Sequence, residues 1–344
     1  MRTAAGLLSE RTLRAGARTS KPARDMTADP VSRSAAEYLR FAEVGVRGKS
    51  AIYEGLCIEI AKDRPLLERL AALPRERQQP NLLLAAVQFL FSVPSDYKAF
   101  RSLVLGNWAE ISTVIHSRRT QTNEVGRCAP LVCLLGELPQ PLALIEVGAS
   151  AGLCLLADCY SYRYGGWRIG DGTLELECEV HGPAPLPCRV PEVTWRAGID
   201  LDPLDVRDEQ DVRWLEALVW PEEQDRRERL EQATALARQV PPRLIRGDMV
   251  DLLPTVAAEA PADATLVVFH TAALTYLPRR RRREFEATVT SLPVVWISQE
   301  EPGVAELNGT VTAEPVAPAY FVSALDGRPR LLMDSHGRWL QALE

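Results

Sequence analysis

One acid and three small residues follow one another at every second position in a short stretch near the middle of the chain. Glu146, Gly148, Ser150 and Gly152 are each separated by one residue, and they follow the apolar run 142–145. Such a stretch predicts a buried parallel strand that turns sharply into a helix. Glycine lets a ligand approach the backbone there, at the carboxyl end of the strand, where open α/β sheets bind ligands. The stretch therefore indicates a ligand site, although a strand–turn–helix unit of small residues can equally be purely structural.

This spacing resembles the first motif of the class I S-adenosylmethionine-dependent methyltransferases, which reads Glu/Asp-x-Gly-x-Gly-x-Gly. Ser150 stands where the motif usually has its middle glycine. The resemblance implies that S-adenosylmethionine is the cofactor and that Glu146, Gly148, Ser150 and Gly152 bind it. The departure at Ser150 leaves catalytic competence in doubt.

Further acids follow the next two strand-like runs. A carboxylate after the second strand can accept both ribose hydroxyls of such a cofactor. We prefer Asp200 to Asp202 for this role, because the apolar run reaches Ile199 and Asp202 precedes a proline. After the third run, Asp248 is predicted to accept from the adenine amino group and Met249 to pack on the ring. Each acid alone is more often a cap or a loop residue, so the prediction rests on their order.

The fourth strand-like run ends in His270, and Tyr276 lies in the loop that follows. A histidine at this edge could be a general base for a nucleophile that attacks the methyl group, or it could only hydrogen-bond the backbone. Tyr276 is predicted to shape the acceptor site, and both residues are catalytic candidates. The arginines at 279–283 begin a helix, where cations oppose the dipole, and they indicate a solvated face.

A polar segment precedes the first strand. Gln121, Asn123, Glu124 and Arg127 could hold the methionine end of the cofactor or a carboxylate substrate. They could equally form a network that ties the helical part of the chain to the sheet.

The elements that position these residues change character near residue 126. Residues 29–126 predict a helical N-terminal layer over the carboxyl edge of the sheet, and residues 1–28 a disordered tail. Residues 127–344 alternate strands with helices, which is typical of a mainly parallel sheet. We therefore expect an α/β fold, a Rossmann-like class I methyltransferase sheet with a β-hairpin insertion at about 160–191. The predicted strands cover residues 142–147, 192–200, 243–246, 265–270, 294–298, 319–323 and 330–333.

Composition limits the partners. The net charge of −6 gives no electrostatic case for nucleic acid, and no apolar run approaches the roughly 18 residues of a membrane helix. The seven cysteines include no Cys-x-x-Cys pair and predict reduced, packed thiols, with no metal site. We expect a cytoplasmic protein with a small-molecule substrate, and the oligomeric state stays open.

The chain also resembles a bacterial domain-of-unknown-function family of the DUF2332 type. Four segments carry this resemblance: QTNEVGRC (121–128), LIEVGASAGL (144–153), WLEALVWP (214–221) and HGRW (336–339). The family pattern continues with Asn where this chain has Cys154, so a polar role at that position is in doubt. Because this family implies no reaction, the functional prediction rests on the methyltransferase-like order of motifs.

We expect an S-adenosylmethionine-binding protein that transfers a methyl group to a small-molecule acceptor. The alternatives are another nucleotide-using enzyme on the same fold and a degenerate methyltransferase that acts as a binding or scaffold protein.

Overall fold

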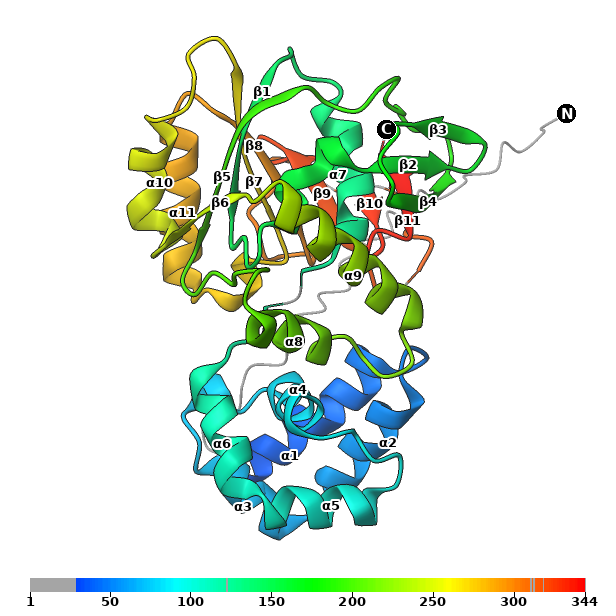
Figure 1. Cartoon of the computed structure of the whole chain (residues 1–344), viewed down its shortest axis with the longest axis vertical. Coiled ribbons are helices and arrows are strands. Elements are labelled where there is room, and N and C mark those ends of the chain that lie inside the picture. The colour runs from blue at the N-terminus through cyan, green and yellow to red at the C-terminus, as the bar shows by residue number, and fades with distance from the viewer. Residues whose placement is uncertain (1–28, 122, 310, 312, 318, 344) are drawn as a thin grey trace, which may run out of the picture.

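The computed structural model describes residues 29–121, 123–309, 311, 313–317 and 319–343, so the predicted tail lies outside the described residues. Figure 1 shows a helical lobe below a lobe that contains the sheet. The helical lobe consists of α1 (Pro30–Arg40), η1 (Phe41–Val46), α2 (Ala51–Ile60), α3 (Arg64–Ala71), η2 (Arg75–Arg77), α4 (Pro80–Leu90), α5 (Tyr97–Gly106) and α6 (Trp108–Ser117).

Local sequence explains where these helices begin. The side chains of Asp29, Ser50, Asp63 and Asp96 accept backbone N–H groups at the first turns of α1, α2, α3 and α5. Such caps satisfy donors that have no partner within the helix. Helix α4 is apolar on most faces, as expected for a helix that packs against both α6 and α8 (Glu209–Ala217).

The sheet lobe contains one mixed sheet. Its strands are β1 (Leu142–Val147), β2 (Ser161–Tyr164), β3 (Trp167–Ile169), β4 (Glu175–His181), β5 (Val193–Asp200), β6 (Arg243–Arg246), β7 (Thr265–Thr271), β8 (Val295–Glu300), β9 (Phe321–Leu325), β10 (Arg328–Met333) and β11 (Trp339–Ala342). Their order is β3-β2-β4-β11-β10-β9-β8-β7-β1-β5-β6. The expected α/β architecture with a mostly parallel sheet is confirmed.

The five strands β8, β7, β1, β5 and β6 are parallel. After β1 the chain forms β2, β3 and β4 at the far end of the sheet, returns to β5 and β6 on one side of β1, and then crosses to β7 and β8 on the other side. Strand β1 is therefore central and lies at the point where the order reverses, which is where open α/β sheets bind ligands. All of its side chains are buried, as expected for a continuous apolar run.

Helices cover both faces of these parallel strands. We call the face that packs against η3 (Val125–Arg127), α7 (Cys128–Leu135), η4 (Leu153–Cys159) and α9 (Gln224–Gln239) the first face. The second face packs against α10 (Met249–Ala257), η5 (Leu274–Tyr276) and α11 (Arg279–Ser291). Helix α8 (Glu209–Ala217) follows β5 and lies between the two lobes (Figure 1).

The inserted segment near residues 160–191 extends the sheet. Strands β2 and β3 form an antiparallel hairpin, but β4 pairs in parallel with both β2 and β11. The hydroxyls of three buried tyrosines donate to backbone carbonyls: Tyr160 to Leu153, Tyr162 to Ala157 and Tyr164 to Ala129. These aromatics therefore pack the insertion onto the domain.

Among the described residues, no helix combines the length and apolarity that crossing a membrane requires.

Candidate functional site

The turn after β1 lies at the carboxyl edge of the sheet. Gly148, Ser150 and Gly152 have φ values of +73°, +52° and +70°, so the backbone enters the left-handed region three times. Glycine adopts this conformation freely, but in Ser150 it costs about 1 kcal/mol. The serine is therefore held there by its surroundings.

Both glycines make room for other parts of the protein. A Cβ at Gly148 would lie 2.5 Å from the Cβ of Ala273, in the loop after β7. A Cβ at Gly152 would lie 2.9 Å from side-chain atoms of Leu244 and Pro242. Close contacts with the protein's own side chains are thus enough to explain why glycine is needed at both positions.

Asp200 leaves β5 at its tip and binds the turn. Its Oδ2 accepts from Ser150 N at 2.8 Å, and its Oδ1 accepts from Asp202 N at 2.8 Å and from Gln121 Nε2 at 3.3 Å. The Asp202 carboxylate instead pairs with Arg246. Of the two acids, Asp200 is the one that reaches the turn after β1.

The polar segment before β1 also binds this turn. Gln121 Nε2 donates to the carbonyl of Asp202 at 2.6 Å. Asn123 donates to the carbonyl of Ala149 at 3.0 Å and accepts from Leu153 N at 3.2 Å. Gln121 and Asn123 therefore take part in a hydrogen-bond network, which is the second of the two roles considered for them. A role in substrate binding stays a prediction.

Unpartnered acceptors gather on the first face of the same edge. Glu146 is 4% exposed, and among the described residues its Oε2 has no hydrogen-bond partner. The same holds for Oε1 of Gln121 and Oε1 of Gln299. Burial, with Cys154 and Asp200 nearby, raises the pKa of Glu146 well above its ordinary value, and Arg127 opposes this shift.

Asp248 and Met249 begin α10. Asp248 Oδ1 accepts from Val250 N at 2.8 Å, which caps the helix, and its carboxylate pairs with Arg281. Met249 is 9% exposed, and its methyl carbon would lie 3.9 Å from a Cβ built at Gly148. Met249 thus lies beside the turn, whereas the Asp248 carboxylate already has partners.

His270 lies on the second face and is fully buried. Its Nδ1 is 2.8 Å from Glu300 Oε1, and Trp296 Nε1 donates to its Nε2 at 3.1 Å. Because Nε2 accepts from the indole, the proton is on Nδ1 and points to Glu300. The general-base prediction for His270 is not supported by this geometry, because neither ring nitrogen is available to a substrate.

The loop after β7 carries the other catalytic candidate. Glu300 Oε1 also accepts from Ala273 N and Leu274 N, each at 2.8 Å, which fixes the start of η5. Tyr276 ends η5 and is 54% exposed. Its position leaves the side chain accessible, and its catalytic role stays a prediction.

The two remaining candidates belong to a buried charged region that sequence reasoning did not anticipate. Glu124 Oε2 lies 2.5 Å from Arg226 Nε of α9, and Arg226 also pairs with Glu223. Burial alone would raise the pKa of Glu124, but Arg226 and Arg229 hold it below its ordinary value. Arg127 donates to the carbonyl of Ser335 at 2.7 Å and to Thr271 Oγ1 at 3.1 Å.

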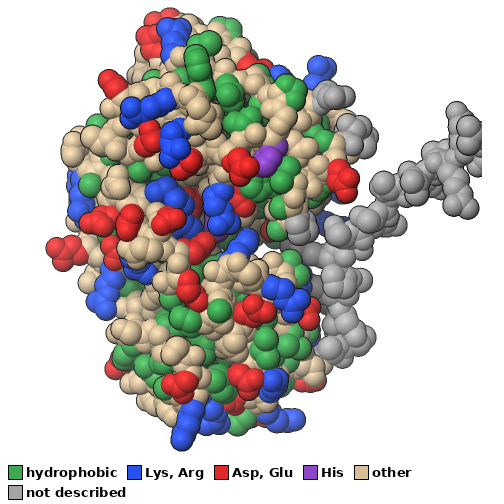
Figure 2. Space-filling view, turned by 90° about the vertical axis from the view of Figure 1, so that its right-hand side faces the viewer, with side chains coloured by type: hydrophobic (Ala, Val, Ile, Leu, Met, Phe, Trp, Pro, Cys, Tyr) green, Lys and Arg blue, Asp and Glu red, His purple; other side chains and the backbone are tan. Residues whose placement is uncertain are grey.

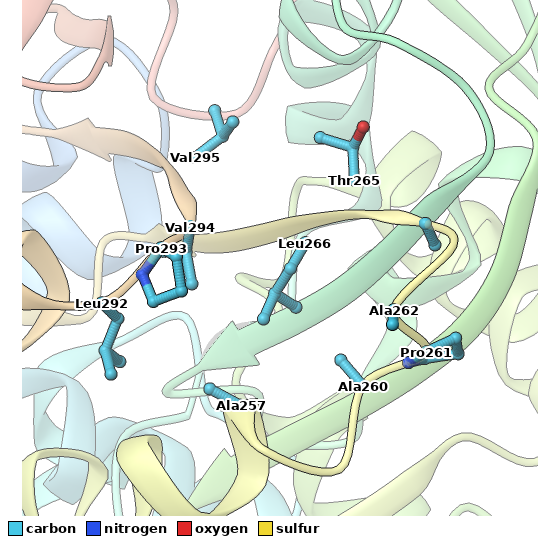
Figure 3. Close-up of a pocket in the computed structure, with 11 residues that line it drawn as sticks. Ala257, Ala260, Pro261, Ala262, Thr265, Leu266, Leu292, Pro293, Val294 and Val295 are labelled. Atoms are coloured by element: carbon cyan, nitrogen blue, oxygen red, sulfur yellow. The ribbon is translucent and has the colours of Figure 1, made fainter.

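A hollow of about 570 Å³ lies at the opposite edge of the sheet, at the amino ends of β7 and β8 (Figure 3). Small and apolar residues such as Ala257, Pro261, Leu266 and Pro293 line it, and its most polar side chain is Thr265. Because no titratable side chain lines this hollow, it does not suit the acid–base or ligand chemistry predicted for the carboxyl edge.

Within the described ranges, no His, Cys, Asp or Glu side chains form a group of three or more that could hold a metal ion.

The model of the family described as "Uncharacterized protein conserved in bacteria (DUF2332)" matches residues 35–342. The chain belongs to this family. No curated protein matches the chain. In this DUF2332 protein the four segments that carry the resemblance lie together. Asn123 bonds to the turn after β1, Trp214 Nε1 donates to the carbonyl of Arg119, and a Cβ at Gly126 would lie 2.3 Å from the carbonyl of His336.

Proposed function

We propose that this DUF2332 protein binds S-adenosylmethionine at the turn after β1 and transfers the methyl group to a small-molecule acceptor. The proposal is carried by one observation: Asp200 at the tip of β5 hydrogen-bonds Ser150 N in the glycine-containing turn. An acid beside a small-residue turn, at the point where the strand order reverses, is the arrangement that binds nucleotide-type cofactors.

The unpartnered groups at this edge fit the cofactor. Its methionine end carries an ammonium group, which needs acceptors, and the oxygens without partners on Glu146 and Gln121 are acceptors. Asp200 Oδ2 has a single hydrogen-bond partner among the described residues, so it can accept a ribose hydroxyl as well. Met249 offers an apolar contact beside the turn.

The protein would contribute alignment more than proton transfer. The sulfonium group of the bound cofactor supplies an already activated methyl group. The remaining requirements are to orient the acceptor in line with that methyl group and to exclude water. Tyr276, which is exposed on the loop beside the edge, is the candidate for orienting the acceptor.

A second candidate, a binding protein without catalysis, is favoured by the turn itself. Ala273 occupies the space beside Gly148, and Pro242 and Leu244 occupy the space beside Gly152. Ser150 replaces the remaining glycine of the motif. A turn filled by the protein's own atoms gives a large ligand less access to the backbone.

Titration calorimetry of the full chain with S-adenosylmethionine and S-adenosylhomocysteine tests the proposal. We expect both to bind, and Asp200→Ala to weaken binding by about 30- to 150-fold, because a charge-assisted contact contributes roughly 2–3 kcal/mol. Asp202→Ala is the matched control, since that carboxylate pairs with Arg246, and it should weaken binding much less.

Because Asp200 also holds the turn, urea unfolding of each variant must show that it is folded. No heat with either ligand from folded wild-type protein would contradict cofactor binding. Equal affinities of Asp200→Ala and wild type would place any cofactor elsewhere. Binding of both ligands without methyl transfer to any acceptor would favour the non-catalytic candidate.

A further inference from the structure

A cluster of basic side chains lies where the two lobes meet, away from the turn after β1. It includes Lys49 from the loop before α2, Arg226 and Arg229 from α9, Arg127 from η3, and His336 and Arg338 from the turn after β10; we call this the basic cluster. On the face shown in Figure 2, Lys and Arg side chains gather with Asp and Glu side chains at the waist between the lobes.

The backbone fixes His336 in place. A Cβ at Gly126 would lie 2.3 Å from the carbonyl oxygen of His336, and a Cβ at Gly337 would lie 2.0 Å from the carbonyl oxygen of Gly126. The two segments therefore pack backbone against backbone. Asp334 Oδ1 closes the turn by accepting from His336 N at 3.0 Å. The backbone of His336 is thus held firmly.

The basic cluster holds more positive than negative charge. Glu124 lies 2.5 Å from Arg226 and 3.5 Å from Arg229. Asp334 lies 3.1 Å from Arg338. Five cations face three carboxylates: Lys49, Arg127, Arg226, Arg229 and Arg338 against Glu124, Glu223 and Asp334. Arg127 and Arg226 are the buried cations of this set, at 5% and 7% exposure, whereas Arg338 is 54% exposed and partly screened by water. Buried charge without a counter-charge is costly, so the inner end of the basic cluster favours an anion.

Two side chains of the basic cluster have a buried nitrogen without a hydrogen-bond partner among the described residues: His336 at Nδ1 and Arg229 at Nε. The side chain of His336 is 10% exposed. The nearest carboxylate oxygen, Glu223 Oε1, is 3.7 Å away, too far for a hydrogen bond. Burial, followed by the charges of Arg226 and Arg127, lowers the pKa of His336 well below its ordinary value. The ring therefore has one unsatisfied buried nitrogen.

Exposure changes steadily across the basic cluster. The side chains of Arg338, Arg229 and Arg226 are 54%, 23% and 7% exposed. Arg338 therefore marks the solvent-facing end of the basic cluster and Arg226 its inner end. Burial also lowers the pKa of Lys49, and an anion beside its ammonium group would reverse that shift.

We propose that the basic cluster binds the carboxylate or phosphate group of a small molecule, contacted by Lys49, Arg338 and the ring of His336. The site stands on its own and does not require S-adenosylmethionine to bind. Arg127 connects it to the carboxyl edge, because the same guanidinium bonds Ser335 in this turn and Thr271 at the end of β7. An acidic substrate held here would extend toward that edge.

Proton–carbon NMR of the histidine rings tests this site directly. The chain has four histidines, so the His336 signal is assigned by its loss in His336→Gln. Inorganic phosphate and malonate are titrated separately into the full chain, with chloride adjusted to hold ionic strength constant. We expect at least one of them to shift the His336 signal saturably, with a Kd of about 1 mM or tighter. The signals of His116 and His181 should not follow the same curve.

Two variants keep the proposal falsifiable. Lys49→Gln and Arg338→Gln should each lower the affinity for the anion that binds by about tenfold, because each removes one charged contact. Arg207→Gln is the matched control, since Arg207 is an exposed arginine paired with Asp205, and its affinity should equal that of wild type. An unchanged His336 signal with both anions, or equal binding by Lys49→Gln, Arg338→Gln and wild type, would overturn the proposal.

Discussion

The two faces of the sheet differ in the contacts that their acidic side chains make at the carboxyl edge. The acid on the first face is Glu146 of β1, and the acid on the second face is Glu300 of β8. On the second face, Glu300 Oε1 accepts three hydrogen bonds, from His270 and from two backbone groups of the next loop. On the first face, Oε2 of Glu146 and Oε1 of Gln299 have no hydrogen-bond partner among the described residues, and Oε2 of Glu300 on the second face also lacks one. Glu300 therefore fixes the following loop through one of its oxygens, whereas Glu146 has an unbonded oxygen that the proposed function assigns to a ligand.

The largest effect should come from the second face. His270→Ala removes a fully buried ring, both of its hydrogen bonds and its contact with Phe285. We expect a loss of about 3 kcal/mol or more in the free energy of unfolding, measured in urea. If His270→Ala were as stable as wild type and lost only activity, the assignment of this face to stability would be wrong.

The turn after β1 should depend on that second face. Gly148→Ala places a Cβ against Ala273, whose N–H is held by Glu300, and it adds strain at a φ of +73°. Together these should destabilise the protein by about 2–3 kcal/mol in urea unfolding. Adding Ala273→Gly to the Gly148→Ala variant should restore the part of the stability that is lost to the clash. Gly165→Ala is the matched control, because it has a similar φ and no neighbouring atoms within 4 Å.

On the first face, Glu146 should make stability depend on pH. Its pKa is raised in the folded protein, so between its unfolded pKa and this higher value the folded state binds more protons. Stability contributed by the neutral carboxyl is then lost as pH rises through that window, by at most about 1.4 kcal/mol per pH unit. Urea unfolding at pH 5 to 8 should show that the stability of Glu146→Gln increases relative to that of wild type as pH rises. Parallel curves would show that Glu146 is not buried as described.

The smallest effect should come from Ser150→Gly. Relief of a left-handed serine should stabilise the protein by about 0.5–1 kcal/mol, less the weak contact of its hydroxyl with the Gln121 carbonyl. The same variant restores the motif glycine, so calorimetry shows whether Ser150 limits cofactor binding. Lower stability on this substitution would contradict the strained conformation.

Sequence patterns predicted the parallel strands well, because short runs with apolar centres alternate with helical stretches along this part of the chain. The predicted bounds 142–147 and 243–246 match β1 and β6. Strand β11 was missed, since its four residues include the polar Gln341 and it becomes a strand only by pairing with β10 and β4. The alternating run that became β4 was assigned to a hairpin, because alternation does not identify the partner of a strand.

The candidate site was predicted less completely, for a physical reason. The position of Asp200 at the tip of β5 was predicted from the apolar run that reaches Ile199, and the structure has it there. Its hydrogen bond to Ser150 N was not predicted, and its contact with a ribose stays a prediction. His270 also ends a strand, but its contacts with Trp296 and Glu300 come from another strand, and no local pattern reveals them. The basic cluster was missed for the same reason, since Lys49 and His336 are far apart in sequence.

The place of β11 also has a consequence for synthesis on the ribosome. This strand is hydrogen-bonded between β10 and β4, and so joins the block β3-β2-β4 to the rest of the sheet. Until residue 342 has left the exit tunnel, a nascent chain presents β4 and β10 as two unpaired edges that can bind other strands. Protection of those edges by a chaperone would therefore matter until β11 emerges and pairs with them.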